Sequence, residues 1–296
     1  MRSSKEKAAG CDSRRGSLYM IKRTPQPDEP QGNESQISLY FWQYVSAWAP
    51  ALSIMLLAFG VWEIYVRVFE KPAWFLPPPS AVATSLWRDA DILIRNGAIT
   101  FIEVILGFVF ASVAAMILSS AMALSRVAER AAYPFVIAAP TIPWLVIAPL
   151  FLIWFGSGLA PKALIAGLIA FFPIVVTTVD GIRSVDPDMV RLIRTFGANR
   201  WEVFRKVQLP SALPSVFSGL KVAAAVSVIG AVVGEWMGAS EGLGHLMLTS
   251  KSKFLTDRVF AAMTVLACMG IGLFVLISVI EKFVVPWRNK STDREG

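Results

Sequence analysis

Six long apolar segments constrain the fold of this chain more than any other feature of its sequence. They lie at about residues 45–66, 97–124, 134–155, 159–179, 213–237 and 259–281. A helix that crosses a bilayer needs roughly 20 mostly apolar residues, and residues 134–155 and 259–280 contain no charged side chain. Only 17% of all residues are charged, whereas soluble domains average about 25%. The sequence therefore predicts an all-α integral membrane protein with about six transmembrane helices.

Prolines interrupt two parts of this pattern. The third segment contains three of them, which we expect to kink it: Pro140, Pro143 and Pro149. The loop of residues 67–96 contains the run FLPPPSAV, which cannot continue a helix and predicts an extended connector. After this run, Ser80 is expected to cap a short helix that ends near Trp87.

The distribution of Lys and Arg predicts the orientation of the spans. With six spans and the N-terminus inside, the inside segments hold about nineteen of the 28 Lys and Arg residues, and cytoplasmic loops are enriched in these residues. We therefore expect both termini in the cytoplasm, and the net charge of +7 indicates topology rather than a nucleic-acid partner. The expected parts are a disordered basic cytoplasmic tail (1–44), a transmembrane domain (45–285) with a cytoplasmic insert (184–212), and a cytoplasmic tail (286–296).

Few residues are available for catalysis or metal binding. His245 is the only histidine, and the two cysteines, Cys11 and Cys268, lie in a polar tail and an apolar segment. Neither a metal site nor a disulfide framework is predicted from them. The ATP-binding motif G-x-x-x-x-G-K-[S/T] does not occur in the sequence. We expect no enzyme activity and no cofactor in this chain.

The insert reads as two short amphipathic helices. Asp186 is a plausible N-cap, with Pro187 in the first helical position, and Gly197 reads as the C-cap. Asn199 starts a second helix in which Trp201, Phe204 and Val207 share one face, and Leu209-Pro210 is expected to end it. Two interpretations stay open at this point: a helix lying on the inner leaflet, or a helix that docks into a groove of a cytoplasmic partner.

The spacing within the insert resembles a known signature. Permease subunits of binding-protein-dependent ABC importers carry Glu-Ala-Ala, three residues, Gly, nine residues and then Ile-x-Leu-Pro. Here Gly197 is the glycine and Val207 opens the closing element VQLP, whereas Arg191-Leu192-Ile193 replaces Glu-Ala-Ala. The runs LPPPSAV, PWLVIAPLFLIWFGSG and TDRVFAAM resemble the nitrate/sulfonate/taurine branch, and the segments around the insert are most similar to permeases for thiamine-precursor pyrimidines or riboflavin.

This resemblance implies a function and a set of partners. It implies a type I ABC importer permease in the bacterial inner membrane, paired with a second copy, fed by an extracytoplasmic binding protein, and docked on an ATP-binding subunit that holds ATP and Mg²⁺. The same machine for sulfonate, taurine or nitrate is the alternative. The residues expected to couple the permease to the ATP-binding subunit are Asp188, Arg191, Gly197, Ala198, Arg200, Trp201, Phe204, Leu209 and Pro210.

Four residues within the spans are candidates for the solute pathway or a gate: Glu103, Trp144, Gly234 and Glu235. Acidic groups in a membrane are costly and often functional, and Trp144 can stack on a flat aromatic solute. Three of these residues also have a structural interpretation: ion pairing for Glu103, hydrogen bonding to loop backbone for Glu235, and close helix packing for Gly234, which belongs to a stripe of glycines spaced four residues apart along the fifth span. Lys221 is expected to extend its ammonium to the interface.

Two other classes of membrane protein fit the sequence less well. An ion-coupled secondary transporter favours polar coupling sites near mid-membrane and repeated halves, and here only Glu103 is suitably placed and no clear repeat is seen. A membrane enzyme would need paired carboxylates, His or Cys, which this sequence lacks as a set.

Overall fold

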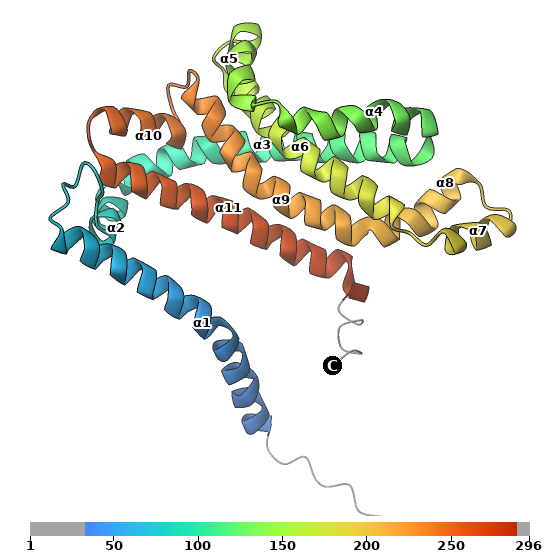
Figure 1. The fold of residues 1–296 in the computed structure, drawn as a ribbon, viewed down its shortest axis with the longest axis horizontal. Coiled ribbons are helices and arrows are strands. Elements are labelled where there is room, and N and C mark those ends of the chain that lie inside the picture. The colour runs from blue at the N-terminus through green and yellow to red at the C-terminus, as the bar shows by residue number, and fades with distance from the viewer. Residues whose placement is uncertain (1–32, 289–296) are drawn as a thin grey trace, which may run out of the picture. The chain divides into compact units, whose positions relative to one another are not determined.

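A computed structural model describes residues 33–288, and within them every element is helical (Figure 1). The elements are α1 (Asn33–Val68), α2 (Pro79–Arg88), α3 (Ala90–Leu124), α4 (Arg126–Ala138), η1 (Ala139–Thr141), α5 (Trp144–Phe155), α6 (Leu159–Arg183), α7 (Pro187–Thr195), α8 (Arg200–Val203), η2 (Phe204–Gln208), α9 (Leu209–Trp236), α10 (Leu243–Ser252), α11 (Thr256–Val284) and η3 (Pro286–Arg288). The predicted all-α class is confirmed.

Five helices are long and apolar enough to cross a membrane: α3, α6, α11, the Ala49–Val68 part of α1, and α8 to α9 as one continuous helix. The predicted third span is wrong as a single kinked helix. It is a pair, α4 and α5, bent by 103° at a short break, and Figure 1 shows α5 leaving the line of α4. Pro140 lies in the turn η1 that ends the first helix of the pair, and Pro143, which cannot donate a backbone hydrogen bond, lies in the break itself. Pro149 lies inside α5. Counting the bent pair as one span gives up to six.

The first helix begins earlier than expected. Helix α1 starts at Asn33, so residues 33–44, assigned to a disordered tail, are helical; residues 1–32 lie outside the described part. The chain divides into two units, residues 1–57 and 58–296.

Ser80 does not cap α2, which was a wrong prediction. The N-cap is Pro78, and Ser80 already lies inside the helix. Its N–H donates to the Glu63 carboxylate at 3.0 Å and its hydroxyl donates to the same carboxylate at 2.8 Å. Glu63 of α1 thus supplies the acceptor that a capping side chain of α2 would otherwise provide.

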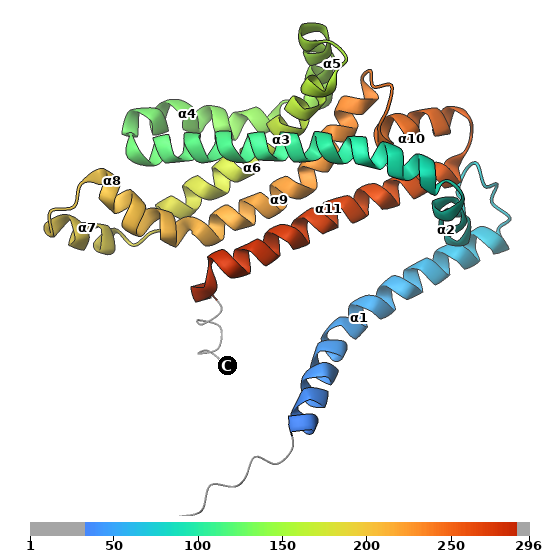
Figure 2. The same ribbon diagram turned by 180° about the vertical axis from the view of Figure 1, so that it is seen from behind.

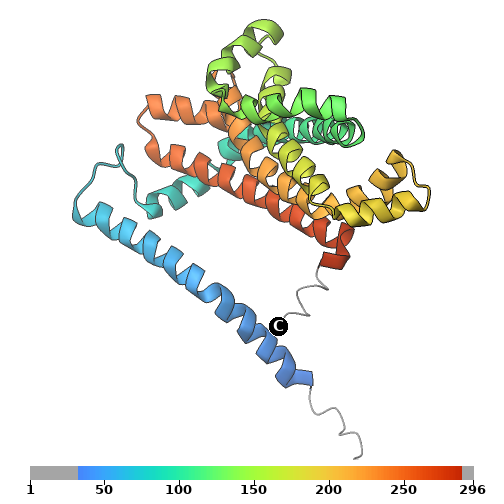
Figure 3. The ribbon, with the colours of Figure 1, turned by 45° about the vertical axis from the view of Figure 1, so that its right-hand side comes forward.

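Helices α6 and α9 form the centre of the second unit, with α3 packed against α6 (Figures 1 and 2). At least half of the residues in the most apolar stretch of each of these two helices are buried, whereas only 17% are buried in the corresponding stretch of α11. The glycine stripe predicted for the fifth span explains the close contact, because a Cβ at Gly230 would lie 2.6 Å from the Ala166 Cα of α6 and one at Gly234 would lie 3.0 Å from the Lys162 Cα. Helix α10 packs against α9, α11 and α3 near the start of α11 (Figure 3).

Candidate functional site

The insert begins and turns as its sequence predicts. The Asp186 carboxylate accepts a hydrogen bond from the Asp188 N–H at 2.8 Å, with Pro187 as the first residue of α7. Gly197 follows α7 with φ of 86°, the left-handed conformation that favours glycine after a helix. Asn199 and Glu202 then form a reciprocal capping box at 2.9 Å each way, which fixes the start of α8.

The second helix of the insert does not end at Leu209-Pro210, contrary to the prediction. The π-helical turn η2 follows α8 and leads directly into α9, so the second helix of the insert and the fifth span form one continuous helix, Arg200–Trp236 (Figure 2). A proline cannot donate the usual backbone hydrogen bond, and a π turn is one of the known ways to accommodate such a break within a helix. Leu209 and Pro210 therefore form the start of α9 rather than the end of a separate helix.

The side chains that were expected to share one docking face of the second helix differ in exposure. Phe204 is 3% exposed and packs with Ile182 and Ala212, and Val207 is also buried. Trp201 is 54% exposed, although its ring lies 5.7 Å from that of Phe204. Phe204 thus anchors this segment in the core, whereas more than half of the Trp201 side chain is exposed.

Helix α7 is the most exposed part of the insert. Its side chains Met189 and Leu192, and Phe196 directly after it, are all more than half exposed. Asp188 and Arg191 form an ion pair at 3.1 Å with both side chains in solvent. The insert therefore presents apolar and charged side chains together, with nothing from its own chain covering them in the described residues.

A buried polar network lies at the other end of the bundle, where α10 packs. Lys162 Nζ is 3.0 Å from Glu103 Oε1, and the Thr100 hydroxyl donates to Glu235 at 2.6 Å. Glu235 also accepts from the Gly244 N–H, and the Leu243 N–H donates to the Thr100 hydroxyl at 2.9 Å. Glu103 and Glu235 are at most 1% exposed. The two acidic candidates thus meet in one network that joins α3, α6, α9 and α10.

Sequence reasoning missed Lys162. It lies in the first turn of α6 and is only 6% exposed. The signal that could have found it is the pairing rule itself, because an acid at the depth of Glu103 requires a basic partner. The structural interpretations of Glu103 and Glu235, ion pairing and hydrogen bonding to loop backbone, both describe the observed contacts.

Two other residues singled out in the sequence, Lys221 and Trp144, contact side chains of neighbouring helices. The ammonium of Lys221 pairs with Glu281 near the end of α11, a partner that the sequence did not predict. Trp144 stacks on Phe172 of α6, with ring centroids 5.5 Å apart and planes at 18°. Both line an apolar cavity of about 350 Å³ with Pro140, Thr177 and Val226.

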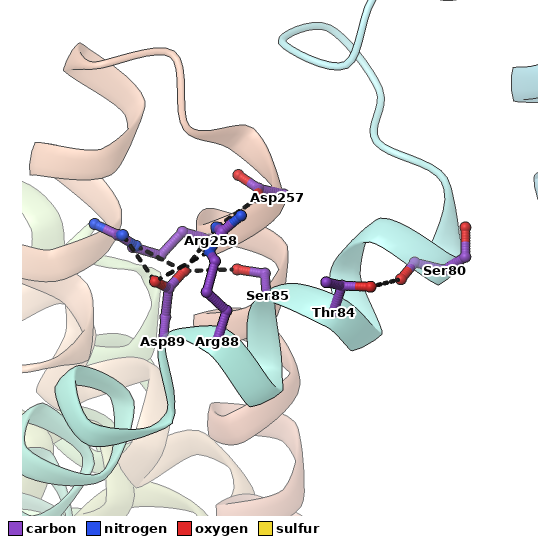
Figure 4. A network of polar contacts seen from close by, with 7 residues as sticks. All are labelled: Ser80, Thr84, Ser85, Arg88, Asp89, Asp257 and Arg258. Atoms are coloured by element: carbon purple, nitrogen blue, oxygen red, sulfur yellow. Dashed lines mark hydrogen bonds and ion pairs between the residues drawn. The ribbon is translucent and has the colours of Figure 1, made fainter.

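A second charged cluster fixes the start of α3 to α11 (Figure 4). Asp89 accepts from Arg258 at 2.9 and 3.1 Å, from Arg88 at 2.9 Å, and from the buried Ser85 hydroxyl at 3.0 Å. Arg88 also pairs with Asp257 at 2.9 Å. The hydrogen bonds from Arg258 and Arg88 hold the pKa of Asp89 well below its ordinary value. This cluster is a structural clamp, and in the described residues no group of three or more His, Cys, Asp or Glu could hold a metal ion.

The chain is similar in sequence to known transport permeases. The family profile of the binding-protein-dependent transport system inner membrane component matches residues 103–290. The formylaminopyrimidine transport permease protein ThiX of Halalkalibacterium halodurans is 34% identical, over 81% of this chain and 96% of the relative. The riboflavin transport system permease protein RibX of Chloroflexus aurantiacus is 35% identical, over 84% and 93%.

A more distant relative and a solved structure agree with this. The taurine transport system permease protein TauC of Escherichia coli is 28% identical, over 84% of this chain and 94% of the relative. An inward-facing structure of the MetNI methionine ABC transporter has the same fold, with a TM-score of 0.57 at 17% identity, over 67% of this chain and 98% of the matched chain. The chain belongs to the family of binding-protein-dependent transport system inner membrane components, the permease subunits of ABC importers.

Proposed function

We propose that this permease passes a small heteroaromatic solute, a thiamine-precursor pyrimidine or riboflavin, across the inner membrane. The observation that carries the proposal is the order of identities. The relatives named for formylaminopyrimidine and riboflavin transport are 34% and 35% identical, whereas those named for taurine and aliphatic sulfonates are 27–28% identical. The stacked Trp144–Phe172 pair beside an apolar cavity supports it, because aromatic side chains stack on flat rings.

The proposed machine has further subunits. Two copies of this chain form the permease, an extracytoplasmic binding protein delivers the solute, and an ATP-binding subunit holding ATP and Mg²⁺ docks on the insert. The exposed side chains of α7 and Trp201 support that docking, since a helix with exposed apolar side chains fits a partner's groove. Both termini lie in the cytoplasm in this arrangement, as the distribution of Lys and Arg favours.

Transport in proteoliposomes tests the substrate. The permease, its ATP-binding subunit and its binding protein would be reconstituted and supplied with formylaminopyrimidine, riboflavin or taurine in turn. We expect ATP-dependent uptake of one of the first two. Uptake of taurine alone would replace the proposal by the sulfonate alternative. Uptake driven by an ion gradient with ATP hydrolysis blocked would identify a secondary transporter instead.

The substitution Gly197→Asp tests docking. No atom lies within 4 Å of a Cβ built at Gly197, so the variant acts through its strained φ of 86° and its new charge rather than through a clash. We expect the variant to reach the membrane but to lose the ATP-binding subunit or its stimulated hydrolysis. Gly197→Asn is the matched control, since asparagine tolerates the left-handed conformation and adds no charge. Copurification of the subunit with Gly197→Asp at the wild-type yield and activity would contradict docking at the insert.

A further inference from the structure

Two cavities adjoin one another between the insert and the turn that joins α3 to α4. One has a volume of about 190 Å³ and the other of about 100 Å³, where a single water needs roughly 10–15 Å³. Both are lined by Met122, Ala123, Glu129 and Gln208. The two cavities therefore form one joined space, which we call the insert cavity. Figures 1 and 2 show the α3–α4 turn and the insert at the same end of the bundle.

Positive charge converges on the insert cavity from three helices. Arg126 of α4, Arg194 of α7 and Arg200 of α8 all line its smaller part. In the part of the chain that the structure describes, no ion pair or side-chain hydrogen bond engages any of these three guanidinium groups. The one carboxylate in the lining, Glu129, is already bound to Arg183 at 2.7 and 3.1 Å. The cavity thus has uncompensated positive charge.

The inner wall of the cavity carries an unpartnered polar group. Ser119 is fully buried, and its hydroxyl has no hydrogen-bond partner, although it lines the larger part of the cavity. A buried hydroxyl without a partner costs free energy, and such groups usually face a water or a ligand. The half-buried Gln208 contributes an amide to the same wall. Ser119 supplies a hydrogen-bond donor in the larger part of the cavity, and Gln208 lines both parts.

We propose that the insert cavity is a binding site for a phosphate group, carried either by an acidic lipid headgroup or by free inorganic phosphate. Guanidinium groups match the oxygens of phosphate with paired, charge-assisted hydrogen bonds, and the Ser119 hydroxyl would donate to a remaining oxygen. On the proposed topology the site lies at the inner leaflet, whose anionic lipids attract basic groups. A bound phosphate would tie α7 and α8 to the α3–α4 turn, whichever solute the permease carries.

The test compares two variants of the full-length permease. In Arg126→Gln/Arg194→Gln the cavity loses two cations, whereas Arg130→Gln removes one exposed arginine of α4 that does not line it. Exposed substitutions of this kind rarely disturb folding, and size-exclusion chromatography checks this. Native mass spectrometry measures retained phosphatidylglycerol against phosphatidylcholine, and titration calorimetry measures binding of inorganic phosphate.

We expect the wild type and Arg130→Gln to bind phosphatidylglycerol, inorganic phosphate or both, and the double variant to bind about tenfold more weakly or worse. Competition of inorganic phosphate with the lipid identifies one shared site; retention of lipid alone identifies the headgroup as the source.

Binding of neither probe to the wild type, or equal loss in Arg130→Gln, would overturn the proposal. If the double variant does not fold, Arg126→Gln alone is measured, and wild-type affinity there would also overturn it. Loss of the ATP-binding subunit without any anion binding would assign these arginines to a protein contact instead.

Discussion

The two ends of the second unit handle charge in opposite ways. At the α10 end, Glu103, Lys162 and Glu235 are nearly completely buried and each has a partner from another helix. At the insert, the side chains of Asp188 and Arg191 are 80% and 76% exposed, and they pair only with each other. A buried charge is stable only with its partner in place, whereas an exposed one is free to bind something else. The first end therefore holds helices together, whereas the exposed charges of the second are accessible to the ATP-binding subunit that we propose docks there.

The largest effect should follow from removing the cation of the buried network. Lys162→Met leaves Glu103 without its counter-ion among buried groups, and an uncompensated buried charge costs about 3–5 kcal/mol. We expect a large fall in melting temperature, measured by a thermal shift assay in detergent. The double variant Glu103→Leu/Lys162→Met removes both charges and should regain much of this loss. If Lys162→Met alone were as stable as the wild type, the network would not be what holds this end together.

Close packing of α6 on α9 should give the next largest effect. Gly230→Ala places a Cβ 2.6 Å from the Ala166 Cα, so the helices must separate, at a cost of about 1–3 kcal/mol. The matched control is Gly272→Ala in α11, where no atom lies within 4 Å of the new Cβ and alanine is the better helix former. Thermal unfolding of both variants should show a loss for the first and none for the second. Equal behaviour would mean that α6 and α9 do not pack as described.

A smaller effect is expected at the clamp between α3 and α11. Asp89→Asn keeps the shape of the side chain but removes the charge that binds Arg258 and Arg88, and we expect a loss of about 1 kcal/mol. The pKa of Asp89 is lowered in the folded protein, so its contribution is fully present above its unfolded pKa of about 3.9 and is lost only as the pH falls further towards the folded value.

The pH dependence separates the charge of Asp89 from its shape. The difference in melting temperature between the wild type and Asp89→Asn should be constant from about pH 8 to pH 5 and should shrink below about pH 4. A difference that changed between pH 5 and pH 8 would show that another titrating group, and not Asp89, controls the stability of the clamp.

The same contrast explains which features the sequence could predict. The insert follows from local rules: Asp186, Gly197 and Asn199 fix helix ends through neighbours within a few residues, and these predictions are confirmed. The spans follow from the length of apolar runs. The Glu103–Lys162 pair lies 59 residues apart in the chain, and the arginines of the insert cavity come from three separate helices. Such contacts depend on how the helices pack, which no local pattern specifies.

The errors have the same origin. Pro140 and Pro143 predicted a kink, but the position of a proline does not specify the size of the bend, which is 103°. Pro210 predicted the end of a helix, because a local rule takes no account of a π turn that lets the helix continue. The sequence did not predict the pairing of Lys221 with Glu281, because Glu281 is contributed by the last span.

The smallest effect on stability is expected at Arg191. A substitution there tests the contrast between the insert and the α10 end most directly. Its side chain is 76% exposed and pairs only with Asp188, three residues earlier, so Arg191→Gln should change stability by no more than about 0.5 kcal/mol. Arg191 occupies the position of the acid in the Glu-Ala-Ala signature that the insert resembles, and at the proposed docking surface an exposed charge would act mainly through long-range attraction. We therefore expect Arg191→Gln to weaken association with the ATP-binding subunit by a few fold at low salt and by less at high salt, where charges are screened. Surface plasmon resonance at two salt concentrations measures this.

Leu192→Ala, on the same helix, removes apolar contact and should weaken association by a similar factor at both concentrations. A loss for Arg191→Gln that did not depend on salt would mean that Arg191 contributes contact area rather than charge. The insert would then use its charged side chains for packing, as the α10 end does.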